Sequence, residues 1–196
     1  MFKRASDTLM SAFALVALAP LLALIAAIVW AETGFPVLFA QERVGLDFRR
    51  FRILKFRTMA VKSGGPAVTV AGDPRVTPVG RILRRTKLDE LPQLWNVLCG
   101  HMSLVGPRPE IPQYVELFKR RYQRVLTVRP GITDMASIHF RNEEEVLSRS
   151  ADPLNEYTER ILPAKLDLAE EYTNTHTILG DVSILLRTAA AIVRHQ

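Results

Sequence analysis

The chain has 196 residues and a formal net charge of +6. This length allows one folded domain with a substantial core, together with a short membrane segment. The single cysteine, Cys99, excludes an internal disulfide, and the excess positive charge indicates an anionic partner such as nucleic acid, an anionic membrane surface or a phosphorylated substrate.

The first element we expect is a membrane segment over residues 1–33. Residues 8–31 contain no charged side chain, and a straight helix of this length would extend about 36 Å, enough to cross the hydrocarbon core. A cleaved signal peptide would have a shorter apolar region. Pro20 removes a helix hydrogen bond near the middle of the run and predicts a kink. Lys3 and Arg4 precede the run and several arginines follow it, which favours a re-entrant helix with both ends in the cytoplasm over a bent spanning helix.

Two extended segments should follow the membrane segment. Residues 37–40 predict a short strand, and residues 48–58 alternate partly between basic and apolar side chains, as is typical of a strand. We expect three of the apolar side chains to be buried or to face the membrane: Phe51, Ile53 and Phe56. The basic side chains of the same stretch would face polar surroundings or bind anionic lipid head groups. These residues are Arg52, Lys55 and Arg57.

A strongly basic region leads into the next element. Between Arg43 and Lys87 there are twelve basic residues and two acidic ones, a net charge of +10. Residues 78–87 carry four of the basic residues, three of which would share one face if the segment is helical. We expect Arg85 to contact a phosphate group, although any of these arginines could face lipid instead.

Two adjacent carboxylates, Asp89 and Glu90, open an amphipathic run that reads TKLDELPQLWNVL from Thr86. We expect Thr86 to be the N-cap of a helix, with Asp89 as the acidic partner of a capping box. A helix N-terminus attracts phosphate groups and favours ionised carboxylates, so phosphate, metal and nucleophile could meet there. Acidic residues are also common in a first turn simply because they complement the helix dipole.

Pro107 and Pro109 should hold Arg108 in an extended conformation, because each proline fixes its own φ and restricts the residue before it. The guanidinium of Arg108 could then bridge two phosphate oxygens. The structural alternative is a stiff turn before the next helix, which we expect over residues 110–124. That helix combines an apolar stripe with a basic cluster and would lie either on the membrane surface or in the core. Farther on, Asp152 predicts a helix start.

Five segments carry a resemblance that covers nearly the whole chain. In order they read FAQERVGLDFRRFRILKFRTM, DPRVTPVGRILRRTKLDELPQLWNVL, HMSLVGPRP, RPGIT and LGDVSILLRT. Behind an N-terminal apolar run, they closely resemble the bacterial sugar transferase family, the monotopic polyprenol-phosphate phosphoglycosyl transferases. We therefore expect a mainly helical α+β fold. A re-entrant membrane helix over residues 1–33, kinked at Pro20, would join a cytoplasmic phosphoglycosyl transferase domain over residues 34–196 that has interfacial helices and short strands.

The resemblance implies an activity and a location. The activity is transfer of a sugar-1-phosphate from a UDP-sugar to polyprenyl (undecaprenyl) phosphate with release of UMP, the first membrane step of a surface glycoconjugate pathway. The location is the cytoplasmic face of the bacterial inner membrane, in contact with anionic lipid. Aromatic residues are not interleaved with the basic run as stacking platforms, so nucleic acid is not an expected partner. The sugar and the oligomeric state stay open, a homodimer included.

The expected mechanism has two displacements. Asp89 attacks the β-phosphate of the UDP-sugar and releases UMP, and polyprenyl phosphate then attacks the acyl-phosphate. Mg²⁺ held by Glu90 and Asp89 would offset the diphosphate charge. Further substrate contacts are expected from six residues, Lys55, Arg57, Arg85, Arg108, Arg141 and Asp181. The alternatives are a single displacement in which Asp89 is only a metal ligand, and a non-catalytic basic membrane scaffold.

The assignments of Lys55, Arg57, Arg141 and Asp181 rest on the resemblance. Asp181 could orient an arginine or the metal shell, or it could be an N-cap. After RPGIT, the family pattern continues with Gly, an aromatic residue and Ala-Gln, whereas this chain has Asp-Met-Ala-Ser at 134–137. This loop is expected to shape the sugar or nucleotide pocket. The chain also has Ala169 where many relatives have an aspartate.

Overall fold

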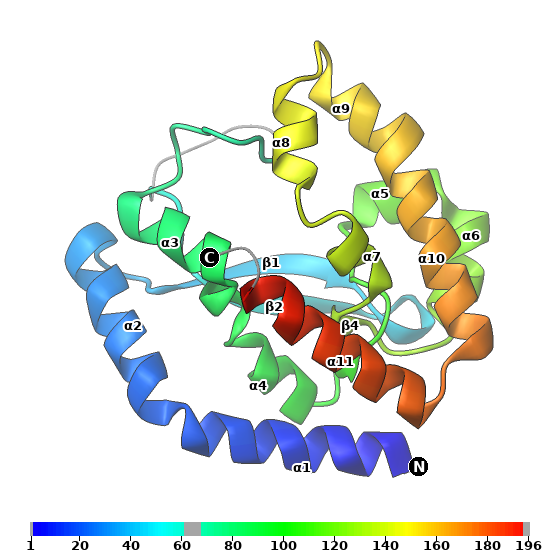
Figure 1. Ribbon diagram of the computed structural model, residues 1–196, viewed down its shortest axis with the longest axis horizontal. Coiled ribbons are helices and arrows are strands. Elements are labelled where there is room, and N and C mark those ends of the chain that lie inside the picture. The colour runs from blue at the N-terminus through cyan, green and yellow to red at the C-terminus, as the bar shows by residue number, and fades with distance from the viewer. Residues whose placement is uncertain (1, 61–67, 194–196) are drawn as a thin grey trace.

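Two helices form a bent arm along one side of the molecule (Figure 1). In the computed structural model, which describes residues 2–60 and 68–193, α1 spans Phe2–Ala17 and α2 spans Ala19–Thr33, with a bend of 63° between them. Within this described part, no single helix is long and apolar enough to cross a membrane, whereas the bent pair together is, by length and composition. The expected kink is confirmed, but the break lies at Leu18. Pro20 occupies the first turn of α2, where a helix tolerates proline.

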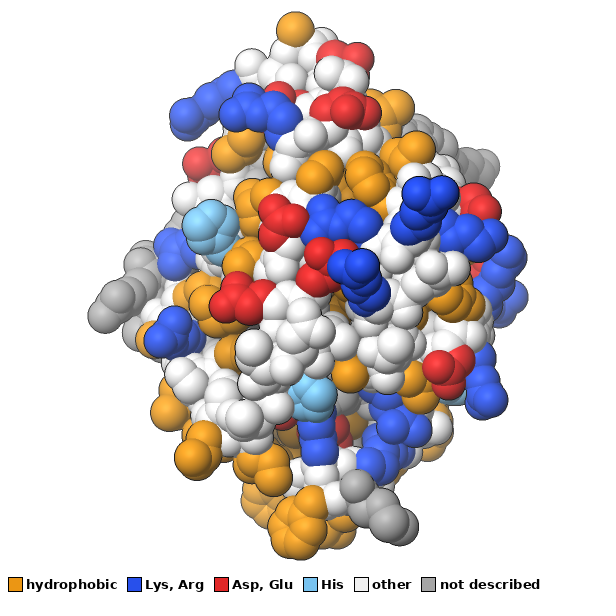
Figure 2. All heavy atoms as spheres, turned by 90° about the vertical axis from the view of Figure 1, so that its right-hand side faces the viewer, with side chains coloured by type: hydrophobic (Ala, Val, Ile, Leu, Met, Phe, Trp, Pro, Cys, Tyr) orange, Lys and Arg blue, Asp and Glu red, His pale blue; other side chains and the backbone are white. Residues whose placement is uncertain are grey.

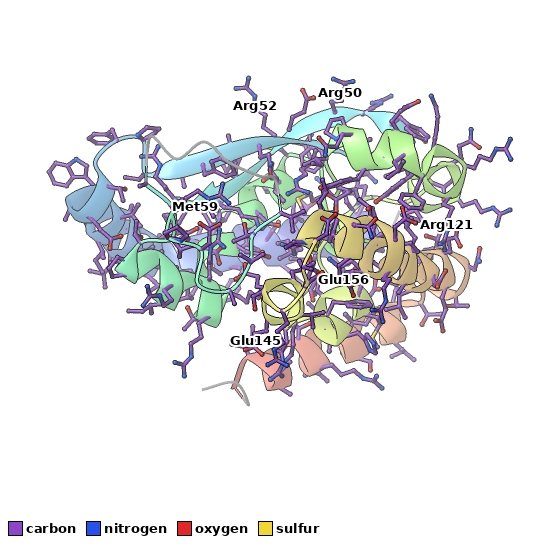
Figure 3. All side chains as sticks on the ribbon, turned by 90° about the horizontal axis from the view of Figure 1, so that it is seen from above. Arg50, Arg52, Met59, Arg121, Glu145 and Glu156 are labelled. Carbon is purple, nitrogen blue, oxygen red and sulfur yellow. The ribbon has the colours of Figure 1, made fainter. Side chains whose placement is uncertain are left out.

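The arm leads into an antiparallel hairpin. β1 (Leu38–Val44) pairs with β2 (Arg50–Phe56), and the short 3-10 turn η1 (Leu46–Phe48) connects them. Both predicted strands are confirmed, although β1 is longer than expected. The apolar side chains predicted to be buried are buried, namely Phe51, Ile53 and Phe56. Arg50 and Arg52 point outward from the hairpin (Figure 3).

The segment predicted as one helix from Thr86 is divided. α3 spans Pro78–Thr86, the 3-10 turn η2 spans Leu88–Glu90, and α4 spans Gln93–Leu98. Thr86 is the last residue of α3 and its hydroxyl donates to a carbonyl of its own helix at 2.8 Å, so the prediction that it is an N-cap is wrong. Lys87 ends α3 in the left-handed conformation, with a φ of 58°. The basic helix and the carboxylates are therefore separate elements.

A second small sheet is formed by residues farther along the chain. β3 (Ser103–Val105) pairs in parallel with β4 (Gly131–Thr133). Between these strands, α5 (Pro112–Leu117) and α6 (Lys119–Val125) replace the single helix expected over residues 110–124. Four buried side chains of these helices belong to the main core. They are Tyr114, Val115, Tyr122 and Val125. This packing supports the core alternative for that segment.

The remaining helices complete a mainly helical α+β fold, as expected (Figure 1). They are α7 (Met135–His139), α8 (Glu143–Ser148), α9 (Pro153–Glu156), the π-helical turn η3 (Tyr157–Ile161), α10 (Leu162–Thr175) and α11 (Ile178–Val193). Asp152 caps α9, as predicted, by accepting from the N–H of Asn155 at 3.1 Å. Charges of both signs mix over the face formed by α6 and α10 (Figure 2), where Arg121 pairs with Glu170 at 2.7 Å.

Polar contacts tie both ends of the arm to the rest of the protein. Near the start of α1, Arg4 donates to two carbonyl oxygens at the end of α4, at 2.7 and 3.1 Å. One turn on, Asp7 accepts from Ser103 Oγ in β3 at 2.6 Å. At the end of α2, Glu32 accepts from the N–H of Val79 in α3 at 3.0 Å. Both ends of the arm are therefore attached to the same folded unit.

Candidate active site

Glu90 in η2 lies at the centre of a buried ion cluster. Lys55 Nζ, from β2, donates to Glu90 Oε1 at 2.8 Å. Arg108, from the loop after β3, donates through Nη2 to the same oxygen at 2.6 Å and through Nη1 to Oε2 at 3.3 Å. Only 10% of the Glu90 side chain is exposed. The structure thus brings together three of the predicted site residues from distant parts of the chain.

Glu90 and its two basic partners stabilise one another's charged forms. Burial opposes ionisation of Glu90, but Arg108 and Lys55 together outweigh it and hold the pKa of Glu90 well below its ordinary value. Burial also lowers the pKa of Lys55, although the negative charge of Glu90 offsets part of this effect. Glu90 is therefore an anion at neutral pH, and it organises the two basic side chains around it.

Asp89 has different surroundings, although it is adjacent to Glu90. It is 6% exposed, and no hydrogen-bond donor among the described residues reaches its Oδ1. Burial, and then the charge of Glu90, raise the pKa of Asp89, while Lys55 partly opposes them. A buried carboxylate oxygen without a donor is costly unless a ligand or metal pairs with it. Asp89 is therefore available for a reaction, whereas Glu90 is committed to its basic partners.

Arg57 offers a second buried polar group without a partner. Its N–H extends the hairpin by donating to Val37 O at 2.9 Å, and residues two apart in an extended strand project to the same face, so Arg57 and Lys55 share one face. No acceptor within the described part of the chain reaches the buried Nη1 of Arg57. Arg57 can therefore donate to an anionic ligand, which fits the phosphate contact expected of it.

Two contacts between uncharged groups hold together the elements that carry this site. The sequence motifs did not indicate either of them. Asn96 in α4 donates through Nδ2 to Arg52 O at 2.8 Å and accepts from the N–H of Leu54 at 3.0 Å. This residue fastens β2 to the helix that follows the carboxylates. Gly80 in α3 packs so closely on Thr58 that a Cβ at this position would lie 2.2 Å from Thr58 O. In the sequence, the only hint of the Asn96 contact is a single asparagine within an apolar helical stripe.

The other predicted substrate residues have different surroundings. Arg85 is exposed on α3. Arg141 is also exposed and donates to a carbonyl oxygen near the end of α11 at 3.3 Å. Asp181 accepts from Tyr172 Oη at 2.8 Å and pairs with Lys3 at the start of α1. Asp181 therefore fastens α1 to the C-terminal half, and the alternative that it caps a helix is wrong, because the Thr177 hydroxyl accepts from an N–H in the first turn of α11.

The residues present can be compared with the needs of the expected Mg²⁺. Among the described residues, no group of three or more histidine, cysteine, aspartate or glutamate side chains is placed so that it could hold a metal ion by itself. Mg²⁺ usually takes one or two carboxylates together with substrate phosphates. Asp89 Oδ1 is a buried acceptor without a donor, and the contact at Glu90 Oε2 is the long one, at 3.3 Å. Each carboxylate oxygen has two lone pairs, so this pair suits an ion that substrate oxygens also bind.

A buried carboxylate pair with cationic partners, attached to an apolar helical arm, suits a class of membrane-associated proteins that act on phosphorylated molecules. Residues 1–195 match the family described as bacterial sugar transferase, and the chain belongs to this family.

Curated relatives show how the chain relates to other members. It is 39% identical to the UDP-glucose:undecaprenyl-phosphate glucose-1-phosphate transferase of Caulobacter vibrioides, over 97% of this chain and 69% of the relative. The protein of the same description in Escherichia coli is 36% identical over 96% of this chain, which spans only 39% of that relative. The exopolysaccharide production protein PSS of Rhizobium leguminosarum bv. phaseoli is 37% identical, over 96% of this chain and 94% of the relative.

Proposed function

We propose that this protein transfers a sugar-1-phosphate from a UDP-sugar to undecaprenyl phosphate for exopolysaccharide synthesis and releases UMP. Two relatives carry donor and acceptor of this kind in their descriptions, and a third is described as an exopolysaccharide production protein. The observation that carries the proposal is the contrast within the carboxylate pair. Asp89 is buried with an oxygen that lacks a donor, next to Glu90, which holds Lys55 and Arg108 in place.

The chemistry we propose begins with attack by a carboxylate oxygen of Asp89 on the β-phosphorus of the UDP-sugar. A bond forms between that oxygen and phosphorus, the bond from phosphorus to the bridging oxygen breaks, and UMP leaves with the electron pair. Arg57, Lys55 and Arg108 offset the negative charge on the phosphoryl oxygens. In the second displacement, an oxygen of undecaprenyl phosphate attacks the same phosphorus and frees Asp89.

Asp89 and Glu90 would hold Mg²⁺ together with oxygens of the substrate diphosphate. When bound, the ion neutralises part of the diphosphate charge. Lys55 and Arg108 keep Glu90 ionised, and burial keeps bulk water away from Asp89. We expect chelation of divalent ions to stop UMP release, and added Mg²⁺ to restore it.

The arm would enter and leave the membrane from the cytoplasmic face of the inner membrane. A spanning arm would place its two ends on opposite sides of a hydrocarbon core roughly 30 Å thick. Here the pairing of Lys3 with Asp181 and the bond between Glu32 and Val79 hold both ends on one folded unit. Large apolar side chains point outward along the arm, among them Leu9, Phe13, Val16, Leu24, Ile28 and Trp30. Leu88 and Leu91 flank the carboxylates and pack against the apolar cluster that contains Ile25 and Val29 of α2, so the carboxylate turn lies next to the arm. A lipid acceptor held beside the arm would reach it.

The function is tested by measuring UMP release by the purified protein with Mg²⁺, undecaprenyl phosphate and a panel of UDP-sugars. We expect release with at least one UDP-sugar, starting with UDP-glucose, and loss of turnover in Asp89→Asn without a lower melting temperature, because the buried charge of Asp89 does not stabilise the fold. No release with any UDP-sugar would contradict the proposal and favour a basic membrane scaffold. Full turnover in Asp89→Asn would exclude the covalent route and favour single displacement.

A further inference from the structure

Asp134 connects the loop that carries Arg108 to the start of α7. It is 4% exposed. Its Oδ2 accepts from the backbone N–H of Arg108 at 3.0 Å, and its Oδ1 accepts from the N–H of Ser137 at 2.7 Å. One buried carboxylate therefore holds two segments that are 26 residues apart in sequence.

The backbone around Arg108 is held on both sides. The N–H of Gly131 donates to Pro107 O at 3.0 Å, and the N–H of Gly106 donates to Thr133 O at 3.1 Å. These bonds fix the strand end before the loop, and the bond from the backbone N–H of Arg108 to Asp134 fixes Arg108 itself. From this position the guanidinium reaches both oxygens of Glu90. The charge of Glu90, and to a smaller extent that of Asp134, also raises the pKa of Arg108.

We propose that Asp134 is a positioning residue that holds the backbone of Arg108 so that its guanidinium faces Glu90 and the substrate phosphate. This inference rests on the proposed function, in which Arg108 contacts that phosphate. The aspartate itself does not touch the substrate.

The variant that separates positioning from helix capping is Asp134→Ser. Serine is a good N-cap, and its one side-chain oxygen can still accept from the N–H of Ser137, but it offers no second oxygen to Arg108. We expect kcat/KM for the UDP-sugar to fall about tenfold, because a small misplacement of a catalytic group is costly. Asp152→Ser is the matched control, since Asp152 caps α9 in the same way, and its kcat/KM should equal that of the wild type.

A double-mutant cycle with Arg108→Ala shows whether Asp134 acts through the guanidinium. In the Arg108→Ala background, Asp134→Ser should change kcat/KM by less than about twofold, because there is no guanidinium left to position. The losses of melting temperature should add, because the backbone bond is lost in either background. Additive losses in kcat/KM, or wild-type kcat/KM in Asp134→Ser, would overturn the proposal.

The same cycle is measured as affinity for UDP by calorimetry, which needs no turnover. We expect Asp134→Ser to reduce the affinity for UDP in the wild-type background and to leave it unchanged in the Arg108→Ala background. This pattern supports the positioning role, even if no sugar donor is turned over. Unchanged affinity for UDP in Asp134→Ser refutes it. Failure of the wild type to release UMP therefore bears on the proposed function, and the variant pattern bears on Asp134.

Discussion

Asp89 and Glu90 are neighbours in sequence with opposite shifts in pKa. Lys55 and Arg108 surround Glu90 and keep it ionised, whereas Oδ1 of Asp89 lacks a donor among the residues that the structure describes. In active sites, pairs of titratable groups with diverging pKa values commonly have separate roles. The contrast supports Asp89 as the group that reacts and Glu90 as the group that organises the cations.

The raised pKa of Asp89 predicts the acid side of the activity profile. In the proposed mechanism Asp89 attacks as an ionised carboxylate, so kcat/KM should decline as the pH falls, starting at a higher pH than for an ordinary aspartate. Because Lys55 partly lowers this pKa, Lys55→Met should move the decline to still higher pH. Measurement of kcat/KM against pH checks both statements, and an identical acid limb in the two proteins would be evidence against them.

Glu90→Gln should destabilise the protein by about 1–3 kcal/mol at neutral pH, because Lys55 and Arg108 lose their anionic partner. The pKa of Glu90 is lower in the folded than in the unfolded state. Its contribution is therefore present above the unfolded pKa and is lost as the pH falls through the folded pKa. The difference in the free energy of unfolding between Glu90→Gln and the wild type should therefore shrink as the pH falls.

Chemical unfolding in detergent at several pH values measures this difference. Glu42→Gln is the control, because Glu42 pairs with Arg50 at the surface, where an ion pair contributes only about 0–1 kcal/mol. A destabilisation by Glu90→Gln that stays constant down to strongly acid pH would disagree with the expected linkage.

The motifs identify Asp89, Glu90, Lys55 and Arg108 from the sequence, and the structure brings these residues together. The contact between Asp134 and Arg108 could not be predicted, because it depends on the pairing of β3 with β4. No local pattern encodes that pairing. The places of Arg85, Arg141 and Asp181 likewise depend on how distant elements pack.

At the scale of elements, the carboxylates lie in a short turn between two helices. The apolar spacing continues across this turn, so periodicity alone predicted one helix from Thr86. Lys87 separates the run from α3 through a left-handed backbone, which is uncommon for a residue other than glycine. Within the run, η2 gives way to α4 at Pro92, which has no N–H for a helix hydrogen bond. The strands and the core helices were better predicted because burial of alternating or stripe-forming apolar residues determines them.

Gly80→Ala tests whether the contact of α3 with Thr58 supports the site. A Cβ at position 80 would lie 2.2 Å from Thr58 O, so α3 would have to move. We expect a loss of about 1–3 kcal/mol in the free energy of unfolding. Arg81→Ala, at an exposed position of the same helix, is the control for placing an alanine in α3 where its Cβ meets no close neighbour of this kind. Equal melting temperatures of the two variants would show that the close approach is unimportant.

At the scale of the whole molecule, the arm and the folded unit form one structure. Lys3 pairs with Asp181 and also donates to Val105 O at 3.1 Å, so α1 contacts both β3 and α11. Hydrophobic side chains gather at the lower end of the face in Figure 2, where α1 begins. Hydropathy and Pro20 were enough to predict a kinked apolar segment. The contacts at its two ends required the folded structure.

The membrane topology is tested by cysteine labelling in intact cells. In a Cys99→Ser background, Phe2→Cys places a thiol at a residue that is 83% exposed at the start of α1. A membrane-impermeant maleimide should label it only after the cells are opened. Leu179→Cys, at an 82% exposed position of the folded unit, should behave in the same way. Labelling of residue 2 from the periplasm, with residue 179 protected, would establish a spanning arm.

The most direct test of the central claim is the mass of the Asp89 peptide after incubation with Mg²⁺ and the UDP-sugar that supports turnover, with no lipid acceptor. We predict an added mass equal to one sugar phosphate on Asp89, released when undecaprenyl phosphate is supplied and absent in Asp89→Asn. Steady transfer to the lipid by a protein whose Asp89 never carries this adduct would contradict the two-step mechanism.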